Sequence, residues 1–224
     1  MSNPNNALNK VLGNVSSGQM FIISAPSGAG KTSLVRALLE RQQATGVAVS
    51  HTTRRHRPGE VDGINYHFID EARFREMIDA GAFLEWASVF GHLYGTSIDA
   101  ANQVLAQGQH LILEIDWQGA QQVRQKMPSA ASVFILPPSL KTLRERLEAR
   151  AQDDAETVRK RTAAAIEEIS HFREFDYLVV NDDFETALDE LTEIVEGRGQ
   201  PYRRDSRLPD LQGLVEDLLS GNLT

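Results

Sequence analysis

The sequence predicts an α/β protein in which a mostly parallel β-sheet is flanked by helices. Short apolar runs alternate with helix-like segments along most of the 224 residues, a pattern typical of the β/α units that build a parallel sheet. The runs are continuous instead of alternating with polar residues, as in strands that are covered on both faces. The first run leads through a glycine-rich turn directly into a helical segment. These observations favour one large α/β domain.

The elements are expected in the following order. Residues 20–24 form the first strand, and the segment after the glycine-rich turn is helical because Leu34, Val35 and Leu38 repeat on one face. Further buried strands are expected at residues 47–50, 111–115, 133–136 and 177–180. Further helices are expected at residues 120–126, 140–150, 157–175 and 184–196.

Residues 19–198 form the predicted domain, and two stretches interrupt its alternation. Residues 51–95 contain an arginine-rich loop, a Pro-Gly turn and one helical segment around Phe74, so we expect an insertion that covers a site. Residues 150–161 are irregular and highly charged, and we expect a lid there. Residues 1–18 are expected to be a flexible leader, and residues 199–224 a linker followed by a C-terminal helix.

Composition excludes several classes of protein. The chain is 41% hydrophobic and 24% charged, and its 23 Lys+Arg against 31 Asp+Glu give a formal net charge of −8. That acidity argues against a nucleic-acid partner. No apolar run reaches the roughly 20 residues of a membrane span, and no export signal is recognised, so we expect a cytoplasmic protein without a membrane partner. With no cysteine, a disulfide framework and a thiolate metal site are excluded.

The glycine-rich turn matches the P-loop pattern. Residues 25–32 read Ala-Pro-Ser-Gly-Ala-Gly-Lys-Thr, with Ala25 where the pattern has glycine. In such a loop, backbone N–H groups surround phosphate oxygens, Lys31 contacts the β- and γ-phosphates and the Thr32 hydroxyl binds Mg²⁺. The alternative is a turn that joins strand to helix and binds nothing. The strand before it and the helix after it favour a nucleotide site in a P-loop NTPase-type core.

A second apolar run ends in two carboxylates, Glu114 and Asp116. Residues two apart on an extended strand leave by the same face, so both side chains are expected at the carboxyl end of the sheet. They could be surface carboxylates, but beside a P-loop we favour a role in the site.

Several motifs together resemble the guanylate kinase family over about residues 19–198. Besides the P-loop, they are residues 50–63 (Ser-His-Thr-Thr-Arg-Arg-His-Arg-Pro-Gly-Glu-Val-Asp-Gly), Tyr66, residues 83–86, 94–96, 114–119, 137–139 and 180–183. The resemblance implies transfer of the ATP γ-phosphate to GMP and also to dGMP, with Mg²⁺ as cofactor, in purine nucleotide metabolism and GMP recycling. It also implies that residues 51–95 are the GMP-binding insertion.

The resemblance assigns residues to each part of the site. Lys31, Arg150 and Arg161 are the expected catalytic residues. The expected ATP-binding residues are Ser24, Ala25, Pro26, Ser27, Gly28, Ala29, Gly30, Lys31, Thr32, Ser33 and Asn181. The expected GMP-binding residues are Ser50, Arg54, Arg57, Tyr66, Glu85, Tyr94, Thr96, Glu114 and Asp116. Thr32 and Asp116 are the expected Mg²⁺ ligands, directly or through water.

The residue types suit these roles. Guanidinium groups of Arg54 and Arg57 can bind phosphate oxygens bidentately, and Glu85 can accept hydrogen bonds from N1–H and the amino group of guanine. Adenine has no proton on N1, so the same carboxylate disfavours AMP. Two alternatives stay open: a P-loop kinase acting on a phosphorylated sugar, and a guanylate-kinase-like module that binds peptides. The apolar C-terminal helix motivates a homo-oligomer.

Overall fold

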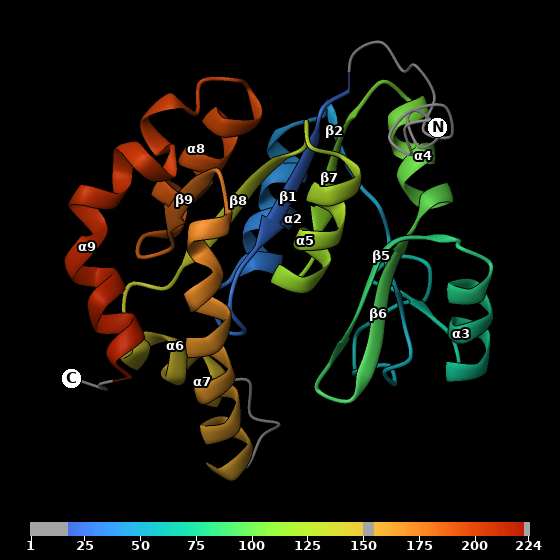
Figure 1. Ribbon diagram of the computed structural model, residues 1–224, viewed down its shortest axis with the longest axis horizontal. Coiled ribbons are helices and arrows are strands. Elements are labelled where there is room, and N and C mark those ends of the chain that lie inside the picture. Colours follow the sequence, from blue (N-terminus) through green and yellow to red (C-terminus); the bar gives the residue numbers. More distant parts are fainter. Residues whose placement is uncertain (1–17, 150–154, 222–224) are drawn as a thin grey trace. The chain divides into compact units, whose positions relative to one another are not determined.

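A computed structural model describes residues 18–149 and 155–221. Within it the chain forms two compact units. Unit 1 contains the described residues up to 22 together with residues 43–131, and unit 2 contains residues 23–42 together with the described residues from 132 onward. The strands form one five-stranded and one four-stranded sheet (Figure 1).

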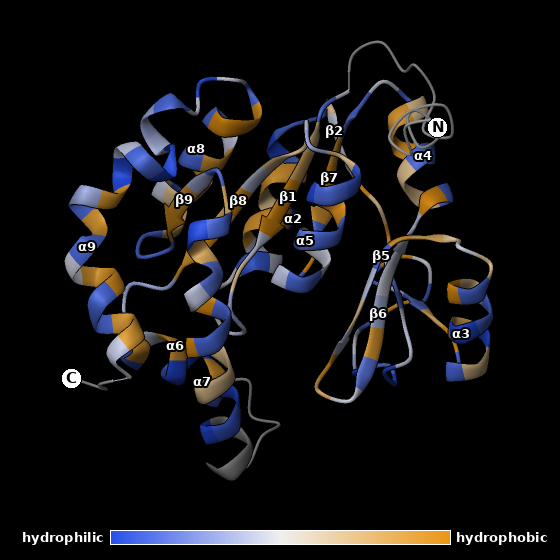
Figure 2. Cartoon of the chain, viewed as in Figure 1, coloured by the Kyte–Doolittle hydropathy of each residue, from blue (hydrophilic) through white to orange (hydrophobic). Residues whose placement is uncertain are grey.

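The larger sheet has the strand order β2-β7-β1-β8-β9. Its strands are β1 (Met20–Ser24), β2 (Thr45–Val47), β7 (His110–Glu114), β8 (Ala131–Leu136) and β9 (Tyr177–Val180). The pairs β2–β7 and β8–β9 are parallel, and β1 and β9 are largely apolar in Figure 2. The α/β prediction, with a mostly parallel sheet and flanking helices, is therefore confirmed.

One predicted strand is displaced along the chain. Instead of residues 47–50, β2 covers Thr45–Val47, with Thr45 paired to His110 and Val47 to Ile112. The pairing with β7 covers these three residues only, so the strand begins and ends earlier than the apolar pattern indicated.

The expected insertion contains a sheet of its own in unit 1, with strand order β4-β3-β6-β5. The strands are β3 (His51–Thr52), β4 (His67–Phe68), β5 (Phe83–Val89) and β6 (His92–Ser97). Helix α3 (Glu71–Asp79) packs on this sheet through Phe74, whose ring stacks on Phe83 with centroids 4.5 Å apart. The helix was predicted from the sequence, but the sheet was not.

Two further helices complete unit 1. Helix α4 (Ile98–Ala106) packs against β2 and β7, and α5 (Trp117–Lys126) packs against β5. Both helices have side-chain N-caps: Ser97 accepts a hydrogen bond from the Ala100 N–H, and Asp116 accepts one from the Gly119 N–H. Because of its cap, α5 begins three residues before the predicted helix.

Unit 2 contains helices on several sides of β8 and β9 (Figure 1). They are α2 (Lys31–Arg41), α6 (Leu140–Glu148), α7 (Ala155–Ser170), α8 (Phe184–Val195) and α9 (Arg204–Ser220), with 3-10 turns η1 (His171–Glu174) and η2 (Gln200–Tyr202). Helix α2 packs on α8, and α7 packs on both α6 and α9. The α6–α7 contact buries Leu143, Leu147 and Ala165 completely.

The C-terminal region differs from the prediction. The expected linker is helical from Arg204 onward, and α9 continues through Pro209. Although proline removes one backbone hydrogen bond, burial of Val215 and Leu218 and an ion pair of Arg207 with Glu190 stabilise the helix. Helix α9 contacts α7 and β9, so apolar residues that motivated an oligomer pack within the chain.

Two other predicted segments are described only in part. Residues 1–17 of the expected leader lie outside the described residues. Residues 150–154 of the expected lid lie outside them as well. Its remaining residues, 155–161, belong to the first turns of α7. No helix in the described part of the chain is long and apolar enough to cross a membrane.

Candidate functional site

The P-loop region in unit 2 consists of residues 24–33 at the end of β1 and the start of α2. Gly28 and Gly30 have φ of 93° and 91°, conformations that side chains rarely adopt. Gly30 is also the N-cap of α2, so the first-turn N–H groups and the positive end of the helix dipole lie next to the loop. Such a helix terminus favours a bound anion. The predicted phosphate site therefore has the local backbone that it requires.

Residues distant in sequence contact this loop and fix its backbone. The Asn181 side chain, almost fully buried, donates a hydrogen bond to the Ala29 carbonyl at 2.7 Å. Glu168 on α7 accepts one from the Ser27 N–H at 2.8 Å. A Cβ added to Gly28 would lie 3.1 Å from Cγ of Leu147. The loop is thus fixed through its backbone on several sides.

Arg146 is a candidate that sequence reasoning missed. Its Nη2 donates to the Asn181 carbonyl at 3.1 Å, while its buried Nη1 has no hydrogen-bond partner among the described atoms. A guanidinium N–H group beside the P-loop suits a phosphate oxygen. Its position in the same predicted helix as Arg150, four residues earlier, was the available signal.

The predicted catalytic residues are placed to different degrees. Lys31 and Thr32 are the first two residues of α2, as expected. Arg161 is half-buried on α7, and its spacing of seven from Glu168 puts both on one face of that helix. Arg150 lies outside the described residues.

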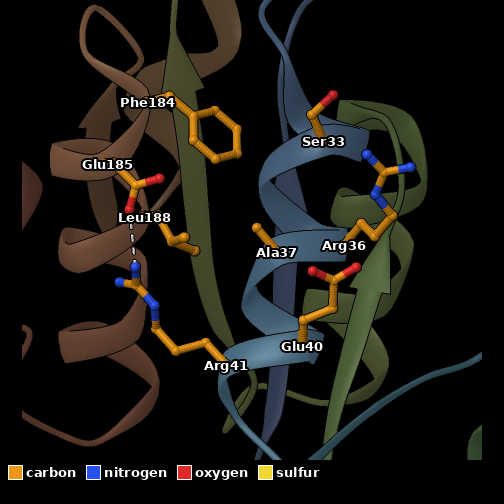
Figure 3. A pocket seen from close by; sticks show the side chains of 8 residues that line it. All are labelled: Ser33, Arg36, Ala37, Glu40, Arg41, Phe184, Glu185 and Leu188. Atoms are coloured by element: carbon orange, nitrogen blue, oxygen red, sulfur yellow. Dashed lines mark hydrogen bonds and ion pairs between the residues drawn. The ribbon is translucent and has the colours of Figure 1, made fainter.

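A groove of about 540 Å³ runs between α2 and α8 beside the P-loop (Figure 3). Its lining residues are Ser33, Arg36, Ala37, Glu40, Arg41, Phe184, Glu185 and Leu188. In Figure 3, Phe184 and Leu188 face Ala37 across the groove, and Arg41 closes one end through an ion pair with Glu185. Ser33, predicted to bind ATP, is one of the residues that line this groove.

In unit 1, Arg54, Glu60, Tyr66 and Tyr94 form the Arg54 cluster. The Arg54 guanidinium lies 5.5 Å from the centre of the Tyr66 ring, and the rings of Tyr66 and Tyr94 are 5.9 Å apart. Burial, with the nearby negative charge of Glu114, raises the pKa of Tyr66 to about 12, so its hydroxyl stays protonated. Three predicted phosphate-binding residues are thus brought together. Arg57 joins them through its backbone, whereas the residue as a whole is exposed.

Ser50, Glu85, Thr96 and Gly119 form the Glu85 cluster, also in unit 1. Glu85 and Thr96 are cross-strand partners in β5 and β6, and Glu85 Oε1 accepts a hydrogen bond from the Thr96 N–H at 2.7 Å. The Thr96 and Ser50 hydroxyl oxygens are 3.0 Å apart. A Cβ on Gly119 would lie 2.4 Å from Glu85 Oε2, so glycine leaves room for the carboxylate. The three residues predicted to bind guanine therefore form one chain of polar contacts.

Burial determines the charge of Glu85. The residue is only 3% exposed, and desolvation raises its pKa to about 7, against hydrogen bonds from Thr96 that favour the ionised form. The negative charge of Asp116 raises this pKa further, and Lys126 opposes that effect. Lys126 donates a hydrogen bond to the Leu84 carbonyl. The carboxyl group therefore changes charge near neutral pH.

The structure corrects the expected geometry of Glu114 and Asp116. Glu114 ends β7, but Asp116 lies beyond the strand as the N-cap of α5. Its Oδ1 accepts a hydrogen bond from the Gly119 N–H at 2.9 Å, and its Oδ2 accepts one from the Gln118 side chain at 3.1 Å. The strand expected to carry both carboxylates therefore carries only Glu114, and Asp116 caps the helix that follows.

The donor groups in the described residues fit a magnesium ion that is held mainly by a nucleotide. No group of three or more His, Asp or Glu residues there could hold a metal alone. Mg²⁺ usually keeps several water ligands and binds one or two protein groups together with phosphate oxygens. The Thr32 hydroxyl at the start of α2 has the oxygen donor that such a site needs.

Comparisons with known proteins agree with this arrangement. A family model described as guanylate kinase matches residues 17–198. A guanylate kinase of Methylobacillus flagellatus is 56% identical over 202 residues, covering 90% of this chain and 99% of the relative. The enzyme of that name from Escherichia coli (strain K12) is 53% identical over 205 residues, covering 91% and 98%. The crystal structure of guanylate kinase from Anaplasma phagocytophilum superposes with a TM-score of 0.69 and 33% identity, covering 83% of this chain and 88% of that one.

Proposed function

The chain belongs to the guanylate kinase family, and we infer from this membership that it is an enzyme that phosphorylates GMP with ATP. The reaction is transfer of the γ-phosphate of ATP to a phosphate oxygen of GMP, which gives ADP and GDP. The observation that carries the inference for this chain is its P-loop. Gly28 and Gly30 have a left-handed backbone conformation there, and Lys31 and Thr32 are the first residues of α2.

We assign the binding of ATP phosphates to the P-loop region. Backbone N–H groups of the loop and the first turn of α2 bind the phosphates, and Lys31 adds a positive charge. Asn181 supports the loop through the Ala29 carbonyl. Three arginines are assigned to stabilise the negative charge that develops on the transferred phosphoryl group in the transition state: Arg150, Arg161 and the additional candidate Arg146.

Magnesium is the proposed cofactor. Thr32 and Asp116 are its proposed protein ligands, directly or through water. The ion would neutralise charge on the β- and γ-phosphate oxygens.

We assign GMP to the two clusters of unit 1. Arg54, Arg57, Tyr66 and Tyr94 bind its phosphate. Glu85, Ser50 and Thr96 bind the guanine, with Glu114 and Asp116 as neighbouring carboxylates. Tyr94 of the Arg54 cluster and Thr96 of the Glu85 cluster lie two residues apart on β6. This arrangement supports one nucleotide that contacts both clusters.

No residue is required as a covalent nucleophile or a general base. The attacking GMP phosphate oxygen is already ionised at neutral pH, so the enzyme has to align the reactants and offset charge. Direct transfer also requires exclusion of water that would otherwise hydrolyse ATP.

The same proposal includes dGMP as a second acceptor and the cytoplasm as the place of action. It includes neither a membrane nor a nucleic-acid partner. A homo-oligomer remains part of it only as a hypothesis, since Val215 and Leu218 of α9 are buried within the chain.

A substrate panel tests the function. ADP formation is measured with ATP and Mg²⁺ against GMP, dGMP, AMP, UMP, CMP and a set of sugar phosphates. We expect rapid reaction with GMP and dGMP and a rate lower by about 100-fold or more with the other acceptors. Equal rates with AMP would contradict the guanine assignment, a preference for a sugar phosphate would favour that class of kinase, and GMP binding without ADP formation would favour a non-catalytic module.

A further inference from the structure

Glu60 is a carboxylate inside the Arg54 cluster that no substrate role explains. Its Oε2 accepts hydrogen bonds from Arg54 Nη1 at 2.9 Å and from the Arg57 backbone N–H at 2.8 Å. Its Oε1 accepts one from Arg54 Nη2 at 2.7 Å. The two side chains are only 11% and 17% exposed, so this ion pair is better protected from solvent than an ordinary surface pair. One carboxylate therefore contacts both arginines assigned to the GMP phosphate.

The local turn explains how Glu60 reaches both arginines. The Glu60 N–H donates to the Arg57 carbonyl at 3.1 Å, which closes a four-residue turn with Pro58 and Gly59 at its centre. Gly59 has φ of 85°, as the third position of a type II turn requires. The turn brings the Glu60 carboxylate back over the chain that precedes it.

The donor geometry of Arg54 shows what this contact leaves for a ligand. A guanidinium has five N–H groups, which form two forks. Glu60 uses one N–H from each terminal nitrogen, and the Arg55 carbonyl accepts the other Nη1–H at 2.7 Å. Glu60 and the Arg55 carbonyl leave one fork, which consists of Nε–H and the second Nη2–H. The Tyr94 side chain also forms a hydrogen bond with this guanidinium and belongs to the same proposed phosphate site. That fork suits two oxygens of a phosphate.

The charges of the pair agree with this geometry. Burial alone would raise the pKa of Glu60, but hydrogen bonds from Arg54 and Arg57 outweigh it and the pKa is lowered. The hydrogen bond to Glu60 in turn raises the pKa of Arg54. Both groups are ionised at neutral pH, so the carboxylate offsets part of the positive charge of the cluster. Any benefit of Glu60 to phosphate binding must then come from orientation.

We propose that Glu60 is a positioning residue for the acceptor phosphate, which fixes the Arg54 guanidinium by one fork so that the other fork binds the phosphate of GMP. It also ties the Arg57 backbone to the same carboxylate, so the two arginines are held as one unit. This inference rests on the proposed binding of GMP at these residues.

The experiment compares a ligand with a phosphate and one without it. Dissociation constants of GMP and guanosine are measured by calorimetry for the unmodified chain, for Glu60→Gln and for Glu71→Gln. Glu71 is the matched control, because it forms an exposed ion pair with Arg75 on α3. We expect Glu60→Gln to weaken the binding of GMP by about tenfold and the binding of guanosine by less than about twofold. Glu71→Gln should change neither dissociation constant.

Other outcomes separate the inference from its alternatives. Unchanged GMP affinity in Glu60→Gln, or equal weakening of GMP and guanosine, would overturn the positioning role. In Arg54→Ala, Glu60→Gln should weaken GMP binding clearly less than it does in the unmodified chain, since only the contact of Glu60 with the Arg57 backbone is left; fully additive losses would also overturn the inference. If Glu60→Gln does not fold by circular dichroism, Glu60→Asp serves instead, with GMP weakened more than guanosine as the expected result and an equal change as the contrary one. Failure of the unmodified chain to bind GMP would instead contradict the proposed function.

Discussion

The two units hold the groups that we propose to bind phosphate in different ways. In the P-loop region the binding groups are mainly backbone N–H groups, fixed by Gly28, Gly30 and hydrogen bonds to the loop. In the Arg54 cluster they are side chains, fixed by an ion pair with Glu60 and by aromatic rings. A backbone site is determined largely by where side chains are absent, whereas a side-chain site depends on the partners that orient it. Substitutions should therefore have different effects in the two regions.

The largest expected effect tests the main side-chain contribution to the P-loop region. Lys31→Ala should reduce kcat by about a thousandfold, because one positive charge at the transferring phosphate is lost in the transition state. GMP affinity should stay within about twofold, since Lys31 is not assigned to that nucleotide. Steady-state kinetics at saturating ATP and calorimetry with GMP measure the two quantities. Lys141→Ala, an exposed lysine on α6, is the control, and near-normal turnover of Lys31→Ala would refute the assignment.

The next effect concerns recognition of the base. Glu85→Gln should reduce the preference for GMP over AMP by about 100-fold, because an amide cannot accept both hydrogen bonds that guanine donates. Stability should not fall at pH 8, since the substitution replaces a buried charged group by a neutral one. The ratio of kcat/KM for the two acceptors and the thermal midpoint are measured, with the exposed Glu76→Gln as control. An unchanged ratio would remove Glu85 from base selection.

The pH dependence of guanosine binding isolates the same carboxyl group. Its pKa is raised to about 7, chiefly by burial, and the hydrogen bonds that we propose from guanine to Glu85 require the ionised carboxylate. Protonation at pH 6 should therefore weaken the binding of guanosine by about tenfold relative to pH 8. The measurement is the inhibition constant of guanosine, which has no phosphate group that titrates in this range. The effect on stability has the opposite sense, because the pKa of Glu85 is higher in the folded than in the unfolded chain. The group stabilises the fold fully below its unfolded pKa of 4.5, and this contribution is lost as the pH rises through about 7. A flat profile in the unmodified chain, or the same slope in Glu85→Gln, would contradict the assignment.

The two regions also differ in how far the sequence predicts them. The P-loop was predicted in detail, because eight consecutive residues specify the strand end, the turn and the helix start. Its supports were not all predictable: Ser27 and Glu168 are 141 positions apart, and no local pattern identifies such a pair. Asn181, 152 positions from Ala29, was assigned only through the family resemblance.

In unit 1, the resemblance identified the residues, but local physics decided their contacts. Glu60 was part of a quoted motif, and its turn with Pro58 and Gly59 was a usable signal for a carboxylate facing Arg57. The hairpin of β5 and β6 was missed because its two-residue turn contains Phe90 with φ of 49°, a conformation that a bulky residue seldom adopts. Asp116 lies just beyond the strand because its side chain caps α5.

The smallest expected effect tests whether the backbone region depends on a supporting side chain at all. Glu168→Ala removes the acceptor of the Ser27 N–H, and we expect the KM for ATP to rise by about three- to fivefold with the KM for GMP unchanged, as for loss of one hydrogen bond that orders a loop. Glu168→Gln keeps an acceptor oxygen and should change the KM for ATP by less than about twofold. Glu167→Ala, the exposed neighbour on α7, is the control. Equal effects of alanine and glutamine would show that charge, not the hydrogen bond, matters there. A loss for ATP in Glu168→Ala as large as the loss for GMP in Glu60→Gln would break the distinction between a site fixed by its backbone and a site fixed by its side chains.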